Sequence, residues 1–225
     1  MRTLLEYIGR NFKCYLKKGK NLMDHYYSSK PSSQSNRETI KTKLVGKEFS
    51  FITDSGVFSK NRVDVGSQVL MEAAAKADLP DGNILDVGCG YGPIGLYLAS
   101  EFTNRQIEMV DVNERALDLA KENANLNEIT NVKIYESNLF EQVEGKNYAA
   151  IISNPPIRAG KKVVHQILEE SYDHLTDGGV LQIVIQKKQG APSAKKKMEE
   201  VFGNVERIAL DKGYWVLESK KDERI

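Results

Sequence analysis

The most informative part of the chain is the stretch ILDVGCGYG at residues 84–92, where an apolar run leads into three glycines at alternate positions. The apolar run predicts a buried strand, and Pro93 opens the helix-length stretch that follows. Glycines in the connecting turn permit positive φ angles and let a ligand approach the backbone closely. A strand, a glycine turn and a helix in this order are typical of a ligand-binding turn in an α/β sheet.

The alternation of strand and helix patterns continues toward the C-terminus. Strand-like apolar runs lie at residues 84–88, 107–112, 132–137, 148–153 and 180–186, and helix-length stretches lie at 93–102, 113–127, 162–175 and 193–203. They predict βαβ units and an α/β fold with a Rossmann-like, doubly wound, mostly parallel sheet. Two last runs, at 205–210 and 214–220, are separated by three residues, whereas a parallel crossover needs about a dozen. We expect a seven-stranded sheet that ends in an antiparallel hairpin.

A shorter lead-in precedes the glycine turn. Its pattern predicts a loop at 28–36, a strand at 47–53, a tight turn at 54–56 and, at 64–67, the cap of a helix that continues through Lys76. The expected organisation is a basic N-terminal extension at residues 1–22, a lead-in segment at 23–62 and an α/β domain at 63–225. Met23 is an alternative start of the protein.

The composition is that of a globular protein, because 40% of the 225 residues are hydrophobic and can form a core. Lys and Arg (32) nearly balance Asp and Glu (31), so no global basic field indicates a nucleic-acid partner. Residues 1–22 carry a net charge of +5, which leaves −4 for the remainder. The basic segment is either a short amphipathic helix that touches RNA or membrane, or an ill-ordered tail.

Cysteines and histidines are few. Cys14 and Cys89 cannot form a disulfide scaffold or a four-cysteine zinc site, and three scattered histidines argue against a histidine-rich metal site. No apolar run approaches the ~20 residues of a transmembrane helix, and no cleavage site of a signal peptide follows the basic N-terminus. We therefore expect a cytoplasmic monomer without a metal ion or a membrane partner.

The ligand of the glycine turn follows from its charge. Gly90, Gly92 and Gly95 fit the spacing of a dinucleotide-binding turn. However, Asp86 would face the pyrophosphate, Pro93 removes a backbone donor at the helix start, and the glycines begin two residues late. An acidic turn suits a ligand with a positive centre. S-adenosylmethionine (SAM), with its sulfonium and α-amino groups, is such a ligand.

Polar residues end the next two predicted strands. Asp111 lies 21 residues after Gly90, where an acid accepts hydrogen bonds from ribose hydroxyls in dinucleotide folds. Its alternative role is the N-cap of the helix at 113–127. Asn138 ends the third strand, and we expect it either to contact an adenine or to form a turn.

The fourth strand is followed by Asn154, Pro155 and Pro156. Two prolines fix an extended backbone that lacks N–H groups and leaves its carbonyls free as acceptors. The Asn154 side-chain oxygen and the Pro155 carbonyl can accept both hydrogens of a planar –NH₂ group, which aims the nitrogen lone pair at an incoming methyl carbon. The motif predicts catalysis by positioning. The alternative is a loop that merely terminates the strand.

Taken together, the motifs resemble the class I SAM-dependent methyltransferases, and within them the small-domain family of guanine-N2 methyltransferases of 16S or 23S ribosomal RNA. The resemblance runs from about Phe49 to the last strand. It rests on DSGVFSKNRVDVGSQVL, LDVGCGYGPIGL, DVNERAL, SNPPIRAGK and QKKQGAPSA. It implies that Asn154, Pro155 and Pro156 hold the target amino group. The SAM site that it implies consists of Asp86, Gly88, Gly90, Tyr91, Asp111, Val112, Asn138 and Leu139.

Two positions depart from the family pattern. Ile157 stands where family members often carry an aromatic residue that stacks on the flipped base, and Asn138 stands where many methyltransferases have an acid. Arg158 can provide a stacking surface through a cation–π contact. Cations beyond the strand ends can neutralise phosphates, although such clusters are otherwise solvated loops. The expected substrate-binding residues are Ile157, Arg158, Lys161, Lys187 and Gln189.

The expected function is methyl transfer from SAM to an exocyclic amino group, guanine N2 of 16S rRNA, with ribosomal RNA or the small ribosomal subunit as partner. One alternative is N5-methylation of a protein glutamine, whose amide is a similar planar –NH₂ group. Another is a non-catalytic SAM- or RNA-binding module for ribosome assembly, against which the intact Asn154 argues.

Overall fold

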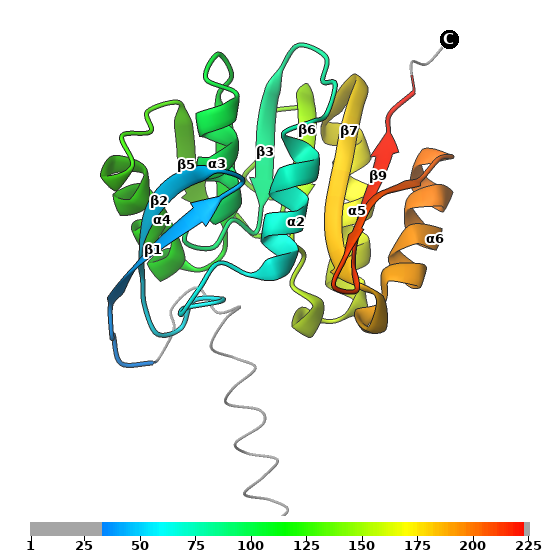
Figure 1. The fold of residues 1–225 in the computed structure, drawn as a ribbon. Helices are drawn as coiled ribbons and strands as arrows, with labels where there is room; N and C mark the ends of the chain where they lie inside the picture. The colour runs from blue at the N-terminus through cyan, green and yellow to red at the C-terminus, as the bar shows by residue number, and fades with distance from the viewer. Residues whose placement is uncertain (1–32, 223–225) are drawn as a thin grey trace, which may run out of the picture.

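The computed structural model describes residues 33–222, which form a seven-stranded sheet flanked by helices (Figure 1). In sheet order the strands are β5 (Val132–Glu136), β4 (Ile107–Asp111), β3 (Asn83–Val87), β6 (Tyr148–Ser153), β7 (Leu175–Gln186), β9 (Tyr214–Lys220) and β8 (Glu206–Asp211). The two pairs made by β9 are antiparallel, and the other pairs are parallel. The predicted mostly parallel sheet with a C-terminal antiparallel hairpin is confirmed.

Helices cover both faces of the sheet. One face carries α2 (Val65–Ala74), α3 (Pro93–Glu101) and α4 (Glu114–Leu126), and the other carries α5 (Lys161–His174) and α6 (Ala191–Phe202). Successive strand residues point to opposite faces, so Ile84 joins the first core and Leu85 the second. Because both faces are buried there, β3, β6 and the second half of β7 are nearly continuous apolar runs, whereas the edge strands β5 and β8 keep exposed residues.

The strand order reverses between β3 and β6, in the middle of the sheet. In open α/β sheets, ligands bind in the crevice at the carboxyl ends of the strands at such a reversal. This edge is the lower one in Figure 1, toward which the arrow of β3 points. The fold thus assigns the candidate site to one edge of the sheet before any side chain is considered.

An antiparallel hairpin packs on α4 beside the sheet. β2 (Lys47–Thr53) was predicted, but its partner β1 (Glu38–Leu44) was not. Charged and polar residues fill most of β1, and its only aliphatic side chains are those of Ile40 and Leu44. Asn123 on α4 accepts from Ile52 N (2.7 Å) and donates to Ile52 O (3.0 Å), as a neighbouring strand would.

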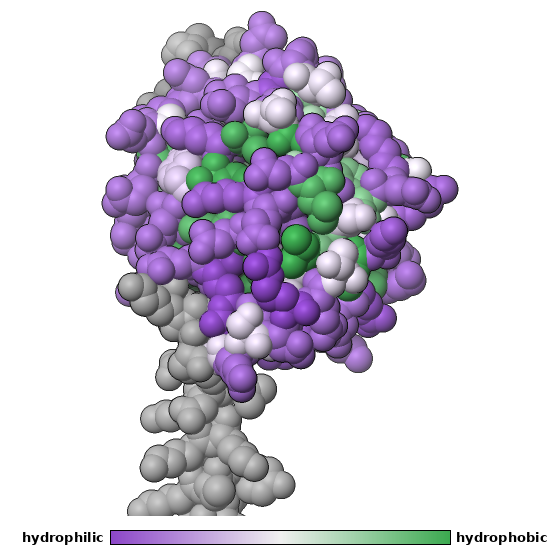
Figure 2. Space-filling model, turned by 90° about the vertical axis from the view of Figure 1, so that its left-hand side faces the viewer, coloured by the Kyte–Doolittle hydropathy of each residue, from purple (hydrophilic) through white to green (hydrophobic). Residues whose placement is uncertain are grey.

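Hydrophobic side chains on the β5 side of the molecule are separated by hydrophilic ones (Figure 2).

Most predicted boundaries agree with the structure to within two residues. The exception is β7, which begins at Leu175, directly after α5, although its apolar run begins at Val180. The intervening Asp177, Gly178 and Gly179 are poor strand formers and hide the start of the strand from a pattern-based prediction. The predicted extension at 1–22 lies outside the described residues. Within 33–222, no helix has the length and hydrophobicity that crossing a bilayer requires.

Candidate active site

The glycine turn between β3 and α3 presents bare backbone at the carboxyl edge. Gly88 has a φ of +77° and Gly90 of +57°, both in the left-handed region that favours glycine. A Cβ atom at either position would have no described atom within 4 Å. Pro93 is the first residue of α3, as predicted. The turn therefore leaves room for a ligand directly against its backbone.

Asp86 lies beneath this turn and not on its open face, which corrects the expectation from the sequence. Its side chain is fully buried, and its Oδ2 accepts from Gly95 N (2.9 Å). Its Oδ1 is buried without a hydrogen-bond partner in residues 33–222. Burial raises the pKa of Asp86 to about 7; the Gly95 N–H opposes this rise, and the Asp111 carboxylate adds to it. The buried carboxyl therefore holds its proton more readily than an exposed aspartate does.

Asp111 ties the end of β4 to the glycine turn. Its Oδ2 accepts from Gly90 N (2.8 Å), and its Oδ1 accepts from Asn113 N (2.9 Å). The alternative role of Asp111 as the N-cap of α4 is not observed, since Asn113 fills it by accepting from Ala116 N (3.1 Å). Burial raises the pKa of Asp111, against the effect of its backbone donors. Each carboxylate oxygen keeps a second lone pair for a ligand donor.

Asn138 forms a turn, one of its two predicted roles, where the chain leaves β5. Its carbonyl accepts from Glu141 N (3.1 Å), and its side chain donates to Glu141 Oε1 (2.7 Å). Leu139 has a φ of +53° and is half-buried, as is Val112 after β4. These residues border the same edge of the sheet as the glycine turn.

The Asn-Pro-Pro motif lies beside the glycine turn. Ser153 Oγ donates to Val87 O (2.8 Å), which joins the ends of β6 and β3. The half-buried Asn154 then donates through Nδ2 to Asp64 Oδ2 (3.2 Å) and to Ser67 Oγ (3.0 Å). Asp64 and Ser67 were predicted as a helix cap and not as site residues. The structure therefore adds the first turn of α2 to the site.

The segment before α2 forms a rim of the site. Tyr91 donates from its hydroxyl to Ser59 O (3.4 Å), and Asn113 Nδ2 donates to Gly56 O (3.0 Å). Between these two anchors, the side chain of Phe58 is 55% exposed. Phe58 lies in the stretch DSGVFSKNRVDVGSQVL, which carried the family resemblance, but it was not predicted as a site residue; its exposure between fixed backbone contacts indicates a functional role.

Cations surround this edge. The predicted substrate-binding side chains Arg158, Lys161, Lys187 and Gln189 are exposed, and Ile157 is half-buried. Arg158 and Ile157 belong to the short helix η1 (Ile157–Ala159), and Lys187 and Gln189 belong to η2 (Lys187–Gln189). Lys187 N donates to Gly213 O (2.8 Å), so that η2 lies against the turn between β8 and β9.

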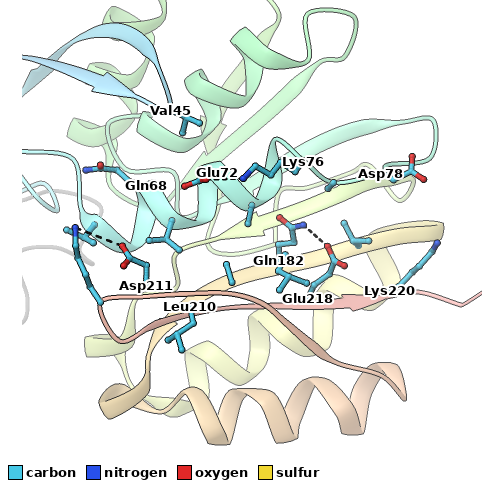
Figure 3. A pocket seen from close by; sticks show the side chains of 18 residues that line it. Val45, Gln68, Glu72, Lys76, Asp78, Gln182, Leu210, Asp211, Glu218 and Lys220 are labelled. Carbon is cyan, nitrogen blue, oxygen red and sulfur yellow. Dashed lines mark hydrogen bonds and ion pairs between the residues drawn. The ribbon is translucent and has the colours of Figure 1, made fainter.

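A groove of about 700 Å³ runs along α2, between this helix and strands β7 to β9 (Figure 3). Its walls carry apolar and charged side chains, such as Val69, Leu210 and Glu72. The fully buried Gln182 donates to Glu218 Oε2 (2.6 Å), while Gln182 Oε1 has no partner in the part of the chain that the structure describes. The predicted site residues lie outside this groove.

The fold and the site define a class I methyltransferase. A sheet that reverses at β3, a glycine turn, an acid at the next strand end and an Asn-Pro-Pro motif at the central strand end occur together at one edge. The chain belongs to the methyltransferase small domain family, because the sequence model of that family matches residues 48–218. The expected family membership is thereby confirmed.

Two relatives of known sequence differ in how much of their length this chain covers. The uncharacterized protein YbxB of Bacillus subtilis is 56% identical over 201 residues, which cover 89% of this chain and all of the relative. Ribosomal RNA small subunit methyltransferase C of Haemophilus influenzae is 33% identical over 158 residues, 68% of this chain and 46% of the relative. The chain thus spans less than half of the rRNA methyltransferase.

A solved structure has the same fold. The 16S rRNA N2 methyltransferase of T. thermophilus, in complex with AdoMet and guanosine, superimposes with a TM-score of 0.74 at 24% identity. The match covers 85% of this chain and 52% of the other. At this identity, the similarity establishes the fold.

The cofactor of the protein is SAM, and the residues present suit it. The buried carboxyl of Asp86, whose Oδ1 has no partner in the described residues, can ionise beside a cationic ligand, and the open space at Gly88 and Gly90 admits a ligand to the backbone. Asp111 keeps acceptor capacity at the next strand end. An anionic pyrophosphate would be repelled by the half-buried Asp111 carboxylate at this edge.

Proposed function

We propose that this methyltransferase modifies an exocyclic amino group of ribosomal RNA, namely guanine N2 of 16S rRNA. The hydrogen bond from Ser153 Oγ to Val87 O carries the proposal, because it brings the Asn-Pro-Pro motif beside the glycine turn. A base amine held by the motif would then lie next to the bound cofactor. The rRNA methyltransferases to which the chain is similar support ribosomal RNA as the substrate class.

The cofactor-binding residues follow from their places at the strand ends. In this proposal Asp111 accepts hydrogen bonds from the ribose, Asp86 balances the positive charge from below, and Val112 and Leu139 contact the adenine with their half-buried apolar side chains. The complete proposed set is Asp86, Gly88, Gly90, Tyr91, Asp111, Val112, Asn138 and Leu139.

The reaction needs little acid–base chemistry from the protein. SAM supplies an electrophilic methyl group on a sulfonium. Asn154 Oδ1 and the Pro155 carbonyl accept the two amine hydrogens, while Pro156 keeps the motif extended. The amine nitrogen forms the new N–C bond as the S–C bond breaks, S-adenosylhomocysteine is released, and the surplus proton passes to water. The protein contributes mainly orientation.

Exposed cations and one aromatic would bind the RNA around the target base. Arg158, Lys161 and Lys187 neutralise phosphates in this proposal, Gln189 donates to the backbone, and Ile157 contacts the base. Because Ile157 has no aromatic ring, the exposed Phe58 in the segment before α2 is the proposed stacking surface.

The test is methyl transfer from radiolabelled SAM to separated substrates from cells that lack the protein: 30S particles, 50S particles, naked 16S and 23S rRNA, and ribosomal proteins. We expect label in 16S rRNA or 30S particles, with N2-methylguanine found by mass spectrometry of the nucleosides. Label on a glutamine of a ribosomal protein would show that the substrate is a protein and not RNA. SAM binding without label in any fraction would favour the assembly module.

A further inference from the structure

The side-chain amide of Asn154 has two orientations, related by a half-turn, and one of them suits the proposed reaction. With Oδ1 toward the substrate, the amide accepts a hydrogen from an amine. With Nδ2 toward the substrate, it meets the amine with a second donor. In the structure, Nδ2 is directed to Asp64 Oδ2 (3.2 Å) and Ser67 Oγ (3.0 Å), so Oδ1 lies on the other branch of the amide.

The charge of Asp64 selects between the two orientations. An ionised carboxylate accepts hydrogen bonds and cannot donate one. A half-turn of the amide would place Asn154 Oδ1 against Asp64 Oδ2 and replace a charge-assisted hydrogen bond with repulsion. Ser67 adds a second acceptor on the same branch of the amide, and its side chain is buried.

The first turn of α2 holds both acceptors in place. Asp64 is the N-cap of α2, and its Oδ2 also accepts from Ser67 N (3.2 Å). A Cβ atom at Gly66 would lie 2.9 Å from Asp64 Oδ2 and 2.8 Å from the ring of Tyr214, so a side chain there would displace the cap or the ring. These contacts explain why the chain has Asp at position 64, Gly at 66 and Ser at 67.

We propose that Asp64 and Ser67 are positioning residues, which hold the Asn154 amide with its nitrogen bound and its oxygen free for the target amine. The inference rests on the proposed role of Asn154 in amine methylation and adds the element that orients it. Asp64 and Ser67 act on the substrate only through Asn154, from which they are separated by 90 and 87 positions in the sequence. The helix cap of α2 thereby becomes part of the catalytic arrangement.

The test separates the cap of α2 from the orientation of Asn154. Serine is a good N-cap, but its shorter side chain does not reach Asn154, so Asp64→Ser keeps the cap and removes one acceptor. Ser67→Ala removes the other. We expect kcat to fall about tenfold in each single variant and about a hundredfold in the double variant, with an unchanged Kd for SAM, because small misplacements of a positioning group cost this much. Asp64→Asn keeps an oxygen on both donors and should retain more of kcat than Asp64→Ser.

A double-mutant cycle with Asn154→Ala shows whether the effect passes through Asn154. In the Asn154→Ala protein, the Asp64→Ser and Ser67→Ala changes should have no further effect on kcat, because the group that they orient is gone. Additive losses would mean that the two residues act on folding or on the cofactor and would overturn the proposal. If Asn154→Ala itself has a normal rate, the proposed function fails before the positioning inference is reached.

A readout without any substrate completes the test. The side-chain NH₂ signals of Asn154 in ¹⁵N-labelled, SAM-bound protein can be assigned by their loss in Asn154→Ala. We expect their hydrogen exchange to be at least about tenfold faster in the double variant than in the wild type, since both acceptors are removed. Equal exchange rates would show that Asp64 and Ser67 do not hold the amide.

Discussion

The carboxylate of Asp111 and the backbone N–H of Gly90 are joined by a hydrogen bond of 2.8 Å, so the end of β4 fixes the glycine turn that follows β3. The other oxygen of Asp111 accepts from Asn113 N at 2.9 Å, at the start of α4. One acidic side chain therefore shapes two neighbouring strand ends and also faces the cofactor edge. Its removal should affect the binding of the cofactor more than the fold.

We expect Asp111→Ala to lower the affinity for SAM about tenfold or more, because lost hydrogen bonds of this kind cost on the order of 1–3 kcal/mol. Asp111→Asn retains one acceptor and should have an intermediate affinity. Calorimetric titration of the wild type and both variants measures the effect. An unchanged affinity in Asp111→Ala, with the fold intact by circular dichroism, would mean that the carboxylate does not contact the ribose.

The pKa of Asp86, raised to about 7 by burial, predicts how the stability of the SAM-free protein depends on pH. The folded state holds this proton more tightly than the unfolded state, whose carboxyl has the ordinary value of 3.8. The stabilisation is therefore complete below that value and is lost as the pH rises through about 7. We expect the Tm of the wild type to fall relative to that of Asp86→Asn over this window. Parallel Tm profiles of the two proteins would contradict the raised pKa.

Bound SAM should reverse this preference for the proton. A cation near Asp86 favours its ionised form, so binding should release a proton and the affinity should rise with pH through about 7. Calorimetry in two buffers of different ionisation enthalpy detects the released proton. The Asp86→Asn variant, which retains the Asp111 carboxylate, should release less, and equal release from both proteins would assign the proton to another group.

Much of the fold could be predicted from the sequence because strands buried on both faces leave long apolar runs, and glycine or proline marks their ends. β1 could not be predicted, since its pairing with β2 and its contact with α4 depend on tertiary structure rather than on its own polar sequence. The start of β7 was hidden for a related reason. Its first residues are glycine-rich, and Gly178 and Gly179 are held by backbone hydrogen bonds with Lys221, just beyond β9, which only the folded sheet brings near.

The candidate site shows the same division. Glycine, acid and Asn-Pro-Pro residues were assigned to strand ends, and the fold gathers those ends at one edge of the sheet. The contacts of Asn154 with Asp64 and Ser67 could not be predicted, because residues about 90 positions apart meet only after the helix has packed. The burial of Asp86 was also missed, since a strand-end carboxylate can lie above or below a turn.

The stability of the hairpin should depend on Asn123. This residue is fully buried, exchanges two hydrogen bonds with Ile52 and donates a third to Tyr91 O (2.9 Å). Asn123→Ala leaves these backbone groups without their partner, so we expect the free energy of unfolding to fall by about 2–4 kcal/mol. Urea denaturation measures it. The matched control is Asn125→Ala, at an exposed position of the same helix, and a similar loss there would refute the role of the buried contacts.

RNA affinity should depend on salt through the exposed cations at the carboxyl edge. The plot of log K against log salt has a negative slope, and Arg158→Gln and Lys187→Gln should each reduce the magnitude of this slope by about 1, if each residue neutralises one phosphate. The controls are Lys195→Gln and Lys196→Gln, which remove exposed charges from α6. Filter binding to a 16S rRNA fragment over a range of salt concentrations distinguishes the two pairs, and equal slopes for all four variants would assign RNA binding to another surface.

Asn154 should be needed for turnover and not for binding of the cofactor. If its side-chain oxygen orients the target amine, Asn154→Ala should bind SAM almost normally but lose turnover by ~10²–10³, the usual effect of removing one well-placed polar group. The contact strengthens as the nitrogen becomes tetrahedral, so it contributes more in the transition state than in the ground state. Single-turnover methylation of 16S rRNA or 30S particles measures this loss separately from product release.

Asn154→Asp tests the chemistry of the same position. A carboxylate still accepts hydrogen bonds, but it adds negative charge near Asp64, since the wild-type amide lies 3.2 Å from Asp64 Oδ2. It also favours the cationic ground state over a transition state in which the positive charge disperses. We therefore expect Asn154→Asp to be nearly as slow as Asn154→Ala. Near-normal rates in Asn154→Ala would instead identify the motif as a strand terminator, and the proposed amine methylation would fall with it.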